Sequence, residues 1–195
     1  HCVVTKPGFI RSGRGMNLPE IKLDNLPFTE IDRFQAKYAL EHGWNYIAGS
    51  LIGTKEQVIT IRKEIDSLSK HHDYKFISKI ENKFGIENIA EIAEVSDGIM
   101  IGRGDMAVEI GYEKVPEAQK FLQKFSRENN LYHIVATEML ESMINSTIPS
   151  NSDISDITKA ILEGADAIML SGETTMGNHP SECVAVMKKL IEYNS

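Results

Sequence analysis

The feature of this sequence that most constrains its fold is a regular alternation of short apolar runs with amphipathic stretches. Apolar residues at three- and four-residue spacing predict helices between the runs, and Pro180 is expected to open a last helix that reaches the end of the chain. Strands that alternate with helices are typical of successive βα units, and therefore of a parallel sheet or barrel. The expected fold class is α/β with about five βα units. The predicted strands are 44–48, 75–80, 98–101, 133–137 and 167–170, and the predicted helices are 31–42, 55–71, 86–93, 116–129 and 155–163.

The first 25 residues differ from the rest of the chain. Prolines and glycines at positions 7, 8, 13, 15 and 19 interrupt any periodic pattern there, and such residues favour turns. We therefore expect residues 1–25 to form a hairpin or linker segment. Residues 26–195 are expected to form one domain, which is long enough to bury a single substantial core.

The composition, with 42% hydrophobic and 25% charged residues, is that of a soluble globular protein. Acidic residues outnumber basic ones by 28 to 21, and the resulting net charge of -7 argues against nucleic acid as a partner. No apolar segment has the length of a membrane span or the position of a signal peptide, so no membrane partner is expected. Cys2 and Cys183 lie far apart without metal-ligand spacing, which predicts free thiols in a reducing, cytoplasmic compartment.

Charged residues gather where the predicted strands end. Lys79 and Glu81 are two residues apart at the end of the second run, so both are expected to project from the same side of an extended chain. Gly102 and Gly104 follow the third run and let backbone N–H groups approach an anion closely, while Asp105 offers a hard oxygen ligand. Because ligand sites of parallel α/β proteins lie at the carboxyl ends of the strands, we expect these residues to share one site.

The chemistry of this set points to a metal ion. Glu81 and Asp105 are the kind of carboxylate pair that Mg2+ or Mn2+ binds, with substrate oxygens and water as the remaining ligands. Lys79 would place an ammonium group beside the ion, where it can neutralise a carboxylate, a phosphate or an enolate. The combination suits a 2-oxo acid and its enolate held by a metal, and it suits phosphoryl transfer equally well.

Five segments, in the same order along the chain, resemble the pyruvate kinase family. The segment 77–82, ISKIEN, is similar to the family segment that carries a catalytic lysine and the first metal-binding glutamate. Segment 15–19 resembles the stretch where the family's inserted lid domain returns to the barrel. An ordered set that covers most of the chain is far more specific than any single motif. The other segments are 96–100 together with 103–105 and 108–110, then 136–143, and finally 166–174.

The resemblance implies the second part of a (β/α)8 TIM-type barrel and assigns roles to individual residues. Lys79 would stabilise the transferring phosphoryl group and the enolate, while Glu81 and Asp105 would hold the divalent ion that bridges the substrate's carboxylate and carbonyl oxygens. Thr137 would lie beside the reacting carbon and join the proton relay that converts enolate into pyruvate.

The resemblance also implies substrate contacts and an overall reaction. Backbone N–H groups of Gly104 and Asp105 would face the substrate carboxylate, and Ser50 would make a secondary contact. The reaction would be the phosphoryl transfer of glycolysis, from phosphoenolpyruvate to ADP, giving pyruvate and ATP. This chain would carry the magnesium and enolate half of the site.

Three parts of the family's chain have no counterpart in this sequence. They are the first three strands of the barrel, the inserted lid domain and the C-terminal domain. Those strands carry the arginine that meets the phosphate, the potassium ligands and much of the ADP/ATP site, so K+ is a possible cofactor whose family ligands are not in this chain. Five strands do not close an eight-stranded barrel. We therefore expect a partial barrel with two exposed edges that self-associates.

Other charged residues have simpler interpretations. Arg103 is expected to hold neighbouring carboxylates in place rather than touch substrate, and Glu109, Glu141 and Glu173 are expected to be solvated or paired charges. The sequence departs from the family pattern at three positions: Glu138 stands where the family has a glutamine, Asn151 where it has an arginine of the subunit contact, and Lys159 where it has a small or amide side chain. The changes at Asn151 and Lys159 leave the mode of subunit assembly open.

Two alternatives to phosphoryl transfer remain at this point. A metal-dependent aldolase or lyase that acts through a pyruvate enolate would use the same carboxylates and a nearby base. A non-catalytic homologue could retain the enolate pocket as a ligand-binding module without the nucleotide half. Nucleotide binding would distinguish phosphoryl transfer from both alternatives. Cleavage of oxaloacetate or of an aldol would distinguish the aldolase or lyase from the other two functions.

Overall fold

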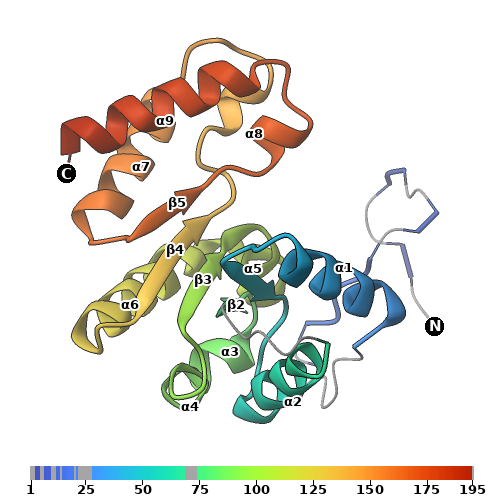
Figure 1. The fold of residues 1–195 in the computed structure, drawn as a ribbon. Coiled ribbons are helices and arrows are strands. Elements are labelled where there is room, and N and C mark those ends of the chain that lie inside the picture. Colours follow the sequence, from blue (N-terminus) through green and yellow to red (C-terminus); the bar gives the residue numbers. More distant parts are fainter. Residues whose placement is uncertain are drawn as a thin grey trace.

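The fold is a five-stranded parallel sheet with helices packed on it, seen in a computed structural model (Figure 1). The structure describes residues 3–4, 7–9, 12–13, 15–19, 21, 28–68 and 74–194. The sheet has the strand order β1-β2-β3-β4-β5, so each strand pairs with its neighbours in the chain. The strands are β1 Tyr46–Gly49, β2 Lys75–Ile80, β3 Gly98–Gly102, β4 Tyr132–Ala136 and β5 Ala167–Met169. All five predicted strands are thus confirmed, with ends that differ by no more than two residues.

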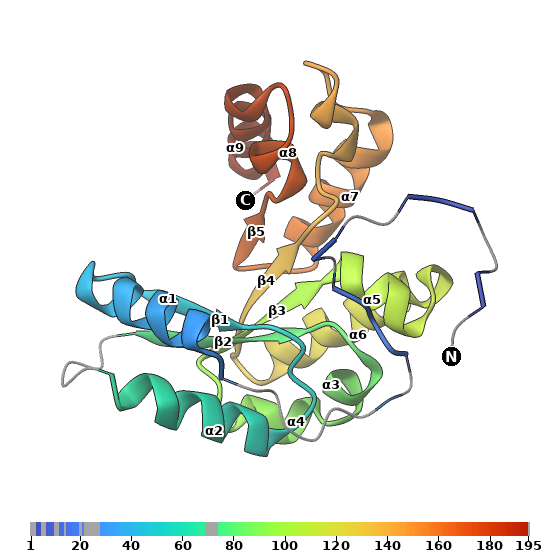
Figure 2. The same cartoon turned by 90° about the vertical axis from the view of Figure 1, so that its right-hand side faces the viewer.

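The helices follow the strands as the alternation predicted. They are α1 Glu30–Glu41, α2 Lys55–Asp66, α3 Lys83–Glu87, α4 Ile89–Ala93, α5 Arg103–Ile110, α6 Val115–Glu128, α7 Asn151–Leu162, α8 Gly172–Thr175 and α9 Pro180–Asn194, with short 3-10 turns η1 Tyr112–Lys114 and η2 Glu141–Ile144. Figures 1 and 2 show α7, α8 and α9 gathered beside β5, whereas α1 and α2 lie at the β1 side. Among the described residues, no helix combines the length and the apolar character that a membrane crossing requires.

Three helix predictions needed correction. Helix α2 ends at Asp66, short of the predicted end, and position 71 itself lies outside the described residues. The predicted helix 86–93 is two short helices because Asn88 leaves the helical conformation between them. Helix α7 begins four residues before the predicted start at 155, since Ser150 and Asp153 form a capping box that satisfies its first N–H groups.

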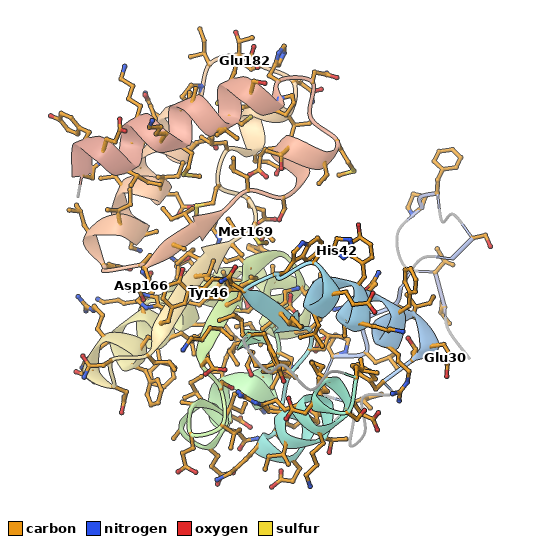
Figure 3. All side chains as sticks on the ribbon, viewed as in Figure 1. Glu30, His42, Tyr46, Asp166, Met169 and Glu182 are labelled. Carbon is orange, nitrogen blue, oxygen red and sulfur yellow. The ribbon has the colours of Figure 1, made fainter. Side chains whose placement is uncertain are left out.

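The core is divided by the sheet into two apolar layers. On the helix-covered face, Phe76, Ile99 and Val135 belong to one large cluster that extends into α2, α6, α7 and α9. The other face carries a smaller cluster of Ile77, Met100 and Ala136, against which Tyr132, Ile134 and Met169 pack. Met169 is labelled in Figure 3. Because side chains alternate along a strand, neighbouring residues 76 and 77 belong to different layers.

The sheet is open at both ends. Within the described part of the chain, β1 and β5 each pair with one strand only, so the outer edge of each is free of strand pairing. The arrangement is that of a partial βα barrel, as the sequence predicted. The described residues of the 1–25 segment contain no helix or strand, and the remainder of that segment lies outside the described residues.

Candidate active site

Lys79 and Glu81 lie side by side where β2 ends. The Lys79 Nζ is 2.7 Å from Glu81 Oε1 and donates to Ser50 Oγ at 3.2 Å, so an ion pair and a hydroxyl hold the ammonium group. Both charged side chains therefore project to the same side of the strand, as their spacing predicted. The Lys79 side chain retains 22% exposure, whereas Glu81 is only 2% exposed.

The Glu81 carboxylate is fixed from three directions. Besides the contact with Lys79, its Oε2 accepts a hydrogen bond from the backbone N–H of Leu51 at 2.9 Å. Gly102, at the end of the adjacent strand β3, packs directly against it: a Cβ at that position would lie 2.5 Å from Oε1. A buried carboxylate is stable only when it is paired or hydrogen-bonded, and these contacts provide that.

Asp105 lies in the first turn of α5, directly after β3. It is exposed, and its Oδ1 lies 3.5 Å from the side-chain amide nitrogen of Asn17, which donates more closely to Glu109 Oε1 at 3.2 Å. Asn17 belongs to the segment that precedes the barrel strands, so this segment passes over the start of α5. The contact between Asn17 and Asp105 joins residues that are 88 positions apart, and no pattern in the sequence predicts it.

A pocket of about 360 Å³ brings these groups together. Glu81 and Asp105 come from successive βα units, and both line the pocket, as does Ser50 beside Lys79. Its walls are completed by the segment 15–18 with Ile21, by Leu51, Gly53, Thr54 and Gln57, and by Asn82, Phe84 and Glu109. The carboxyl ends of β1, β2 and β3 thus meet around one concave site, as the topology predicted.

Thr137 follows β4 in an unusual backbone conformation. Thr137 has φ 71° and Glu138 has φ 55°, so two consecutive non-glycine residues adopt the left-handed region. The Thr137 Oγ1 accepts a hydrogen bond from the Gly104 N–H at 3.0 Å. That N–H, which the resemblance assigns to the substrate carboxylate, is thus engaged with the threonine hydroxyl in this structure.

Arg103 is buried and holds this turn through hydrogen bonds. It is 5% exposed and forms an ion pair with Asp156 on α7, so the prediction that it holds a carboxylate is confirmed. The same guanidinium donates to the carbonyl oxygen of Thr137 from both Nε, at 3.1 Å, and Nη2, and to that of Glu138 from Nη2 at 2.8 Å. The contacts with the turn could not be foreseen from the residue type.

Glu173 supports the other end of the turn, and its prediction as a solvated or paired charge is wrong. The side chain is fully buried, with Oε1 accepting from the N–H groups of Met139 and Leu140 at 3.0 and 2.9 Å and Oε2 from Ser171 at 2.8 Å. Burial alone would raise the pKa of this carboxyl, but the backbone N–H donors outweigh it and lower the pKa.

The two other glutamates behave more simply. Glu141 is exposed as expected, and desolvation together with the nearby charge of Glu173 raises the pKa of its carboxyl. Glu109 is half-buried and accepts the hydrogen bond from Asn17. Cys183 is a free, buried thiol as expected, and Cys2 lies outside the described residues.

The chemistry of the pocket is compatible with a magnesium-type ion. Within the described ranges, no group of three or more His, Cys, Asp or Glu side chains is placed to enclose a metal. Mg2+ does not require one, because it commonly binds through one or two carboxylates and keeps several waters. The Glu81 carboxylate also has acceptor sites left, since each of its oxygens has one contact to the chain.

Comparison with known proteins decides the family. Residues 1–184 match the family model described as pyruvate kinase, barrel domain. The chain belongs to the pyruvate kinase family. The partial βα barrel is therefore a portion of a pyruvate kinase barrel, and the resemblance of the five ordered segments is confirmed at the level of the family.

Several curated pyruvate kinases are similar over almost the whole chain. The pyruvate kinase of Methanocaldococcus jannaschii is 40% identical over 190 residues, which is 97% of this chain and 42% of that protein. Those of Chlamydia trachomatis serovar D and Clostridium perfringens are also 40% identical, over 95% and 97% of this chain and 38% and 40% of theirs. The chain thus spans about two fifths of the length of these pyruvate kinases.

Proposed function

We propose that this chain carries the magnesium and enolate half of a pyruvate kinase active site. The reaction is transfer of the phosphoryl group of phosphoenolpyruvate to a β-phosphate oxygen of ADP. The bond between phosphorus and the enol oxygen breaks, the new bond to ADP forms, and the enolate takes up a proton at its methylene carbon to give pyruvate. The observation that carries the proposal is the convergence of Glu81 and Asp105 on one pocket, with the Lys79 ammonium group paired to Glu81.

Glu81 and Asp105 are the residues that would hold Mg2+ or Mn2+, and Gly102 leaves the space that the Glu81 carboxylate requires. When bound, the ion supplies a Lewis acid that stabilises negative charge on the substrate oxygens. Lys79 lies beside Glu81 with its ammonium group partly exposed, which suits stabilisation of charge on the phosphoryl group and the enolate. Ser50 orients that ammonium group through its hydroxyl.

Thr137 is the residue proposed to act in the proton step, and the first turn of α5 is proposed to bind the substrate carboxylate. The hydroxyl of Thr137 lies against the Gly104 N–H at the start of α5. Backbone N–H groups at a helix start favour anions, so the N–H of Asp105 would bind the carboxylate there, together with the N–H of Gly104, which it would share with Thr137 Oγ1. A substrate at this position would lie next to the threonine hydroxyl.

The remaining half of the reaction belongs to other segments. The matched pyruvate kinases are more than twice as long as this chain, and we expect the ADP/ATP site and any K+ site to be completed by a longer protein or a second chain. Phosphoenolpyruvate and pyruvate are the ligands that this chain is proposed to bind by itself.

Calorimetric titration of Mn2+ in the presence of oxalate, a mimic of enolpyruvate, tests the proposal. The wild-type chain is expected to bind the pair, and the Glu81→Gln/Asp105→Asn variant is expected not to. The matched control is Glu117→Gln/Glu128→Gln, which removes two exposed carboxylates on α6 and should bind as the wild type does. Absence of binding by the wild type would remove the catalytic assignments.

A further inference from the structure

The turn after β4 is held in a conformation that its own residues disfavour. Left-handed backbone is uncommon for residues with a Cβ, and it is most restrictive for β-branched side chains such as that of Thr137. The neighbouring Glu138 adopts the same region. Such backbone persists only where the surrounding structure imposes it, so contacts outside the turn must do so.

Arg103 makes such contacts with both of these residues. Three of its N–H···O contacts, from Nε and Nη2, end on the carbonyl oxygens of Thr137 and Glu138, the two residues with positive φ. Its remaining terminal nitrogen, Nη1, pairs with Asp156 and lies 3.5 Å from Gln119 Oε1. The guanidinium is thereby fixed by α6 and α7 on one side and fixes the turn on the other.

Arg103 also connects the turn with α5. It is the first residue of this helix, and the next residue, Gly104, donates its N–H to Thr137 Oγ1. The start of α5 therefore holds Thr137 through both its carbonyl oxygen and its hydroxyl. Release of the carbonyl oxygen would allow the turn to relax and the hydroxyl to leave the Gly104 N–H.

We propose that Arg103 is a positioning residue that fixes the hydroxyl of Thr137 for the proton step. This inference rests on the role proposed above for Thr137. Arg103 itself would touch neither substrate nor metal. A lysine could retain the charge and the pairing with Asp156, but its single ammonium cannot reproduce the planar set of donors that reaches two carbonyl oxygens.

NMR of protein labelled with 13C at the threonine methyl groups tests the geometry without reference to activity. The wild type is expected to show one χ1 rotamer for Thr137 from its three-bond couplings, and Arg103→Lys is expected to show rotamer averaging. The resonance is assigned by its loss in Thr137→Ser. Arg127→Lys, a matched change at an exposed arginine of α6, should leave the Thr137 couplings unchanged. Unchanged couplings in Arg103→Lys would overturn the proposal.

A rescue and a second variant separate positioning from general stability. Glu138→Gly in the Arg103→Lys background should restore a single Thr137 rotamer in part, because glycine adopts positive φ without steric cost. Arg103→Gln, which keeps an N–H donor group without the charge, is measured in parallel. If both Arg103 variants lose the cooperative unfolding transition, Arg103 holds the whole fold rather than the turn, and the proposal is wrong.

The functional readout is exchange of the pyruvate methyl protons with solvent deuterium, compared with oxalate affinity in the presence of Mn2+. We expect Arg103→Lys to slow exchange by about tenfold or more, since positioned proton donors contribute at least that much, while oxalate affinity stays within about twofold. An equal loss of both would contradict a positioning role. If the wild type neither binds oxalate nor exchanges protons, the proposed function fails, and the threonine couplings still decide whether Arg103 fixes the turn.

Discussion

At the scale of single residues, Gly102 shows how tightly the proposed metal ligand is packed. An added Cβ would lie 2.5 Å from Glu81 Oε1 and 2.7 Å from its Cγ, which is closer than atoms tolerate. We expect Gly102→Ala to displace the carboxylate and to weaken Mn2+ binding by about 10- to 100-fold, as disruption of groups that orient a metal ligand commonly does. Calorimetric titration with Mn2+ and oxalate measures the change.

Gly172→Ala is the control for this substitution. A Cβ at Gly172 would meet side-chain atoms at 3.6 and 3.7 Å, which is ordinary contact, so Mn2+ affinity should remain as in the wild type. Equal affinities for Gly102→Ala and the wild type would mean that Glu81 is not the ligand.

His133 is a second residue whose surroundings predict a measurable property. It is 1% exposed, and although its Nδ1 lies 3.2 Å from Asp166 Oδ2, neither ring nitrogen has an aligned hydrogen-bond partner. Burial lowers the pKa of the imidazole below 6.5. The negative charge of Asp166 raises this pKa and the positive charge of Arg127 lowers it, but both effects are smaller than that of burial. The folded protein therefore favours the neutral ring.

The consequence is a loss of stability on the acid side. Below pH 6.5 the unfolded chain binds a proton at His133 more readily than the folded chain does, so the free energy of unfolding should fall with pH until the lowered pKa is reached. Urea unfolding at pH 7.5 and 5.5 measures the slope, which His133→Asn should reduce. An equal slope for His133→Asn and the wild type would contradict this expectation.

The sequence predicted the relative placement of those candidate-site residues whose spacing is local. Lys79 and Glu81 share one side of β2 because side chains alternate along any strand, and Asp105 follows a strand that is adjacent in the chain. Contacts of Glu173 with the turn and of Asn17 with α5 join positions 33 to 92 residues apart. A single sequence carries no signal for such contacts, because they depend on how complete βα units pack.

At the scale of secondary-structure elements, the start of α7 is set by its cap. Ser150 Oγ accepts from the Asp153 N–H at 3.1 Å, and Asp153 Oδ2 accepts from the Ser150 N–H at 2.9 Å. We expect Ser150→Ala to reduce the free energy of unfolding by about 1 kcal/mol, the usual cost of losing such a cap, with Ser150→Thr restoring most of it. Urea unfolding checks this value.

Ser155→Ala is the matched control, since this serine is exposed within the same helix and should be close to neutral. An equal loss for both variants would show that the cap does not stabilise α7. The cap was visible in the sequence as a serine followed three residues later by an aspartate. The prediction placed the helix start at 155 because it followed apolar spacing, which begins only after the first turn.

At the scale of the whole molecule, the open sheet predicts association. The outer edges of β1 and β5 lack strand partners among the described residues, and Trp44 and Tyr46 next to the β1 edge are 57% and 52% exposed. Unpaired strand edges and exposed apolar side chains favour contacts between chains. We expect the purified chain to sediment as oligomers. A monomer with one sharp calorimetric transition would contradict this expectation.

The strand order also bears on how the chain acquires its structure during synthesis. Among the described residues, each strand pairs only with strands that are its neighbours in the sequence, and the longest register is that of β3 with β4. A ribosome delivers these units in that same order, so each of the strands β2 to β5 meets a partner strand that is already made. Growth of the sheet can therefore keep pace with translation, from β1 towards β5.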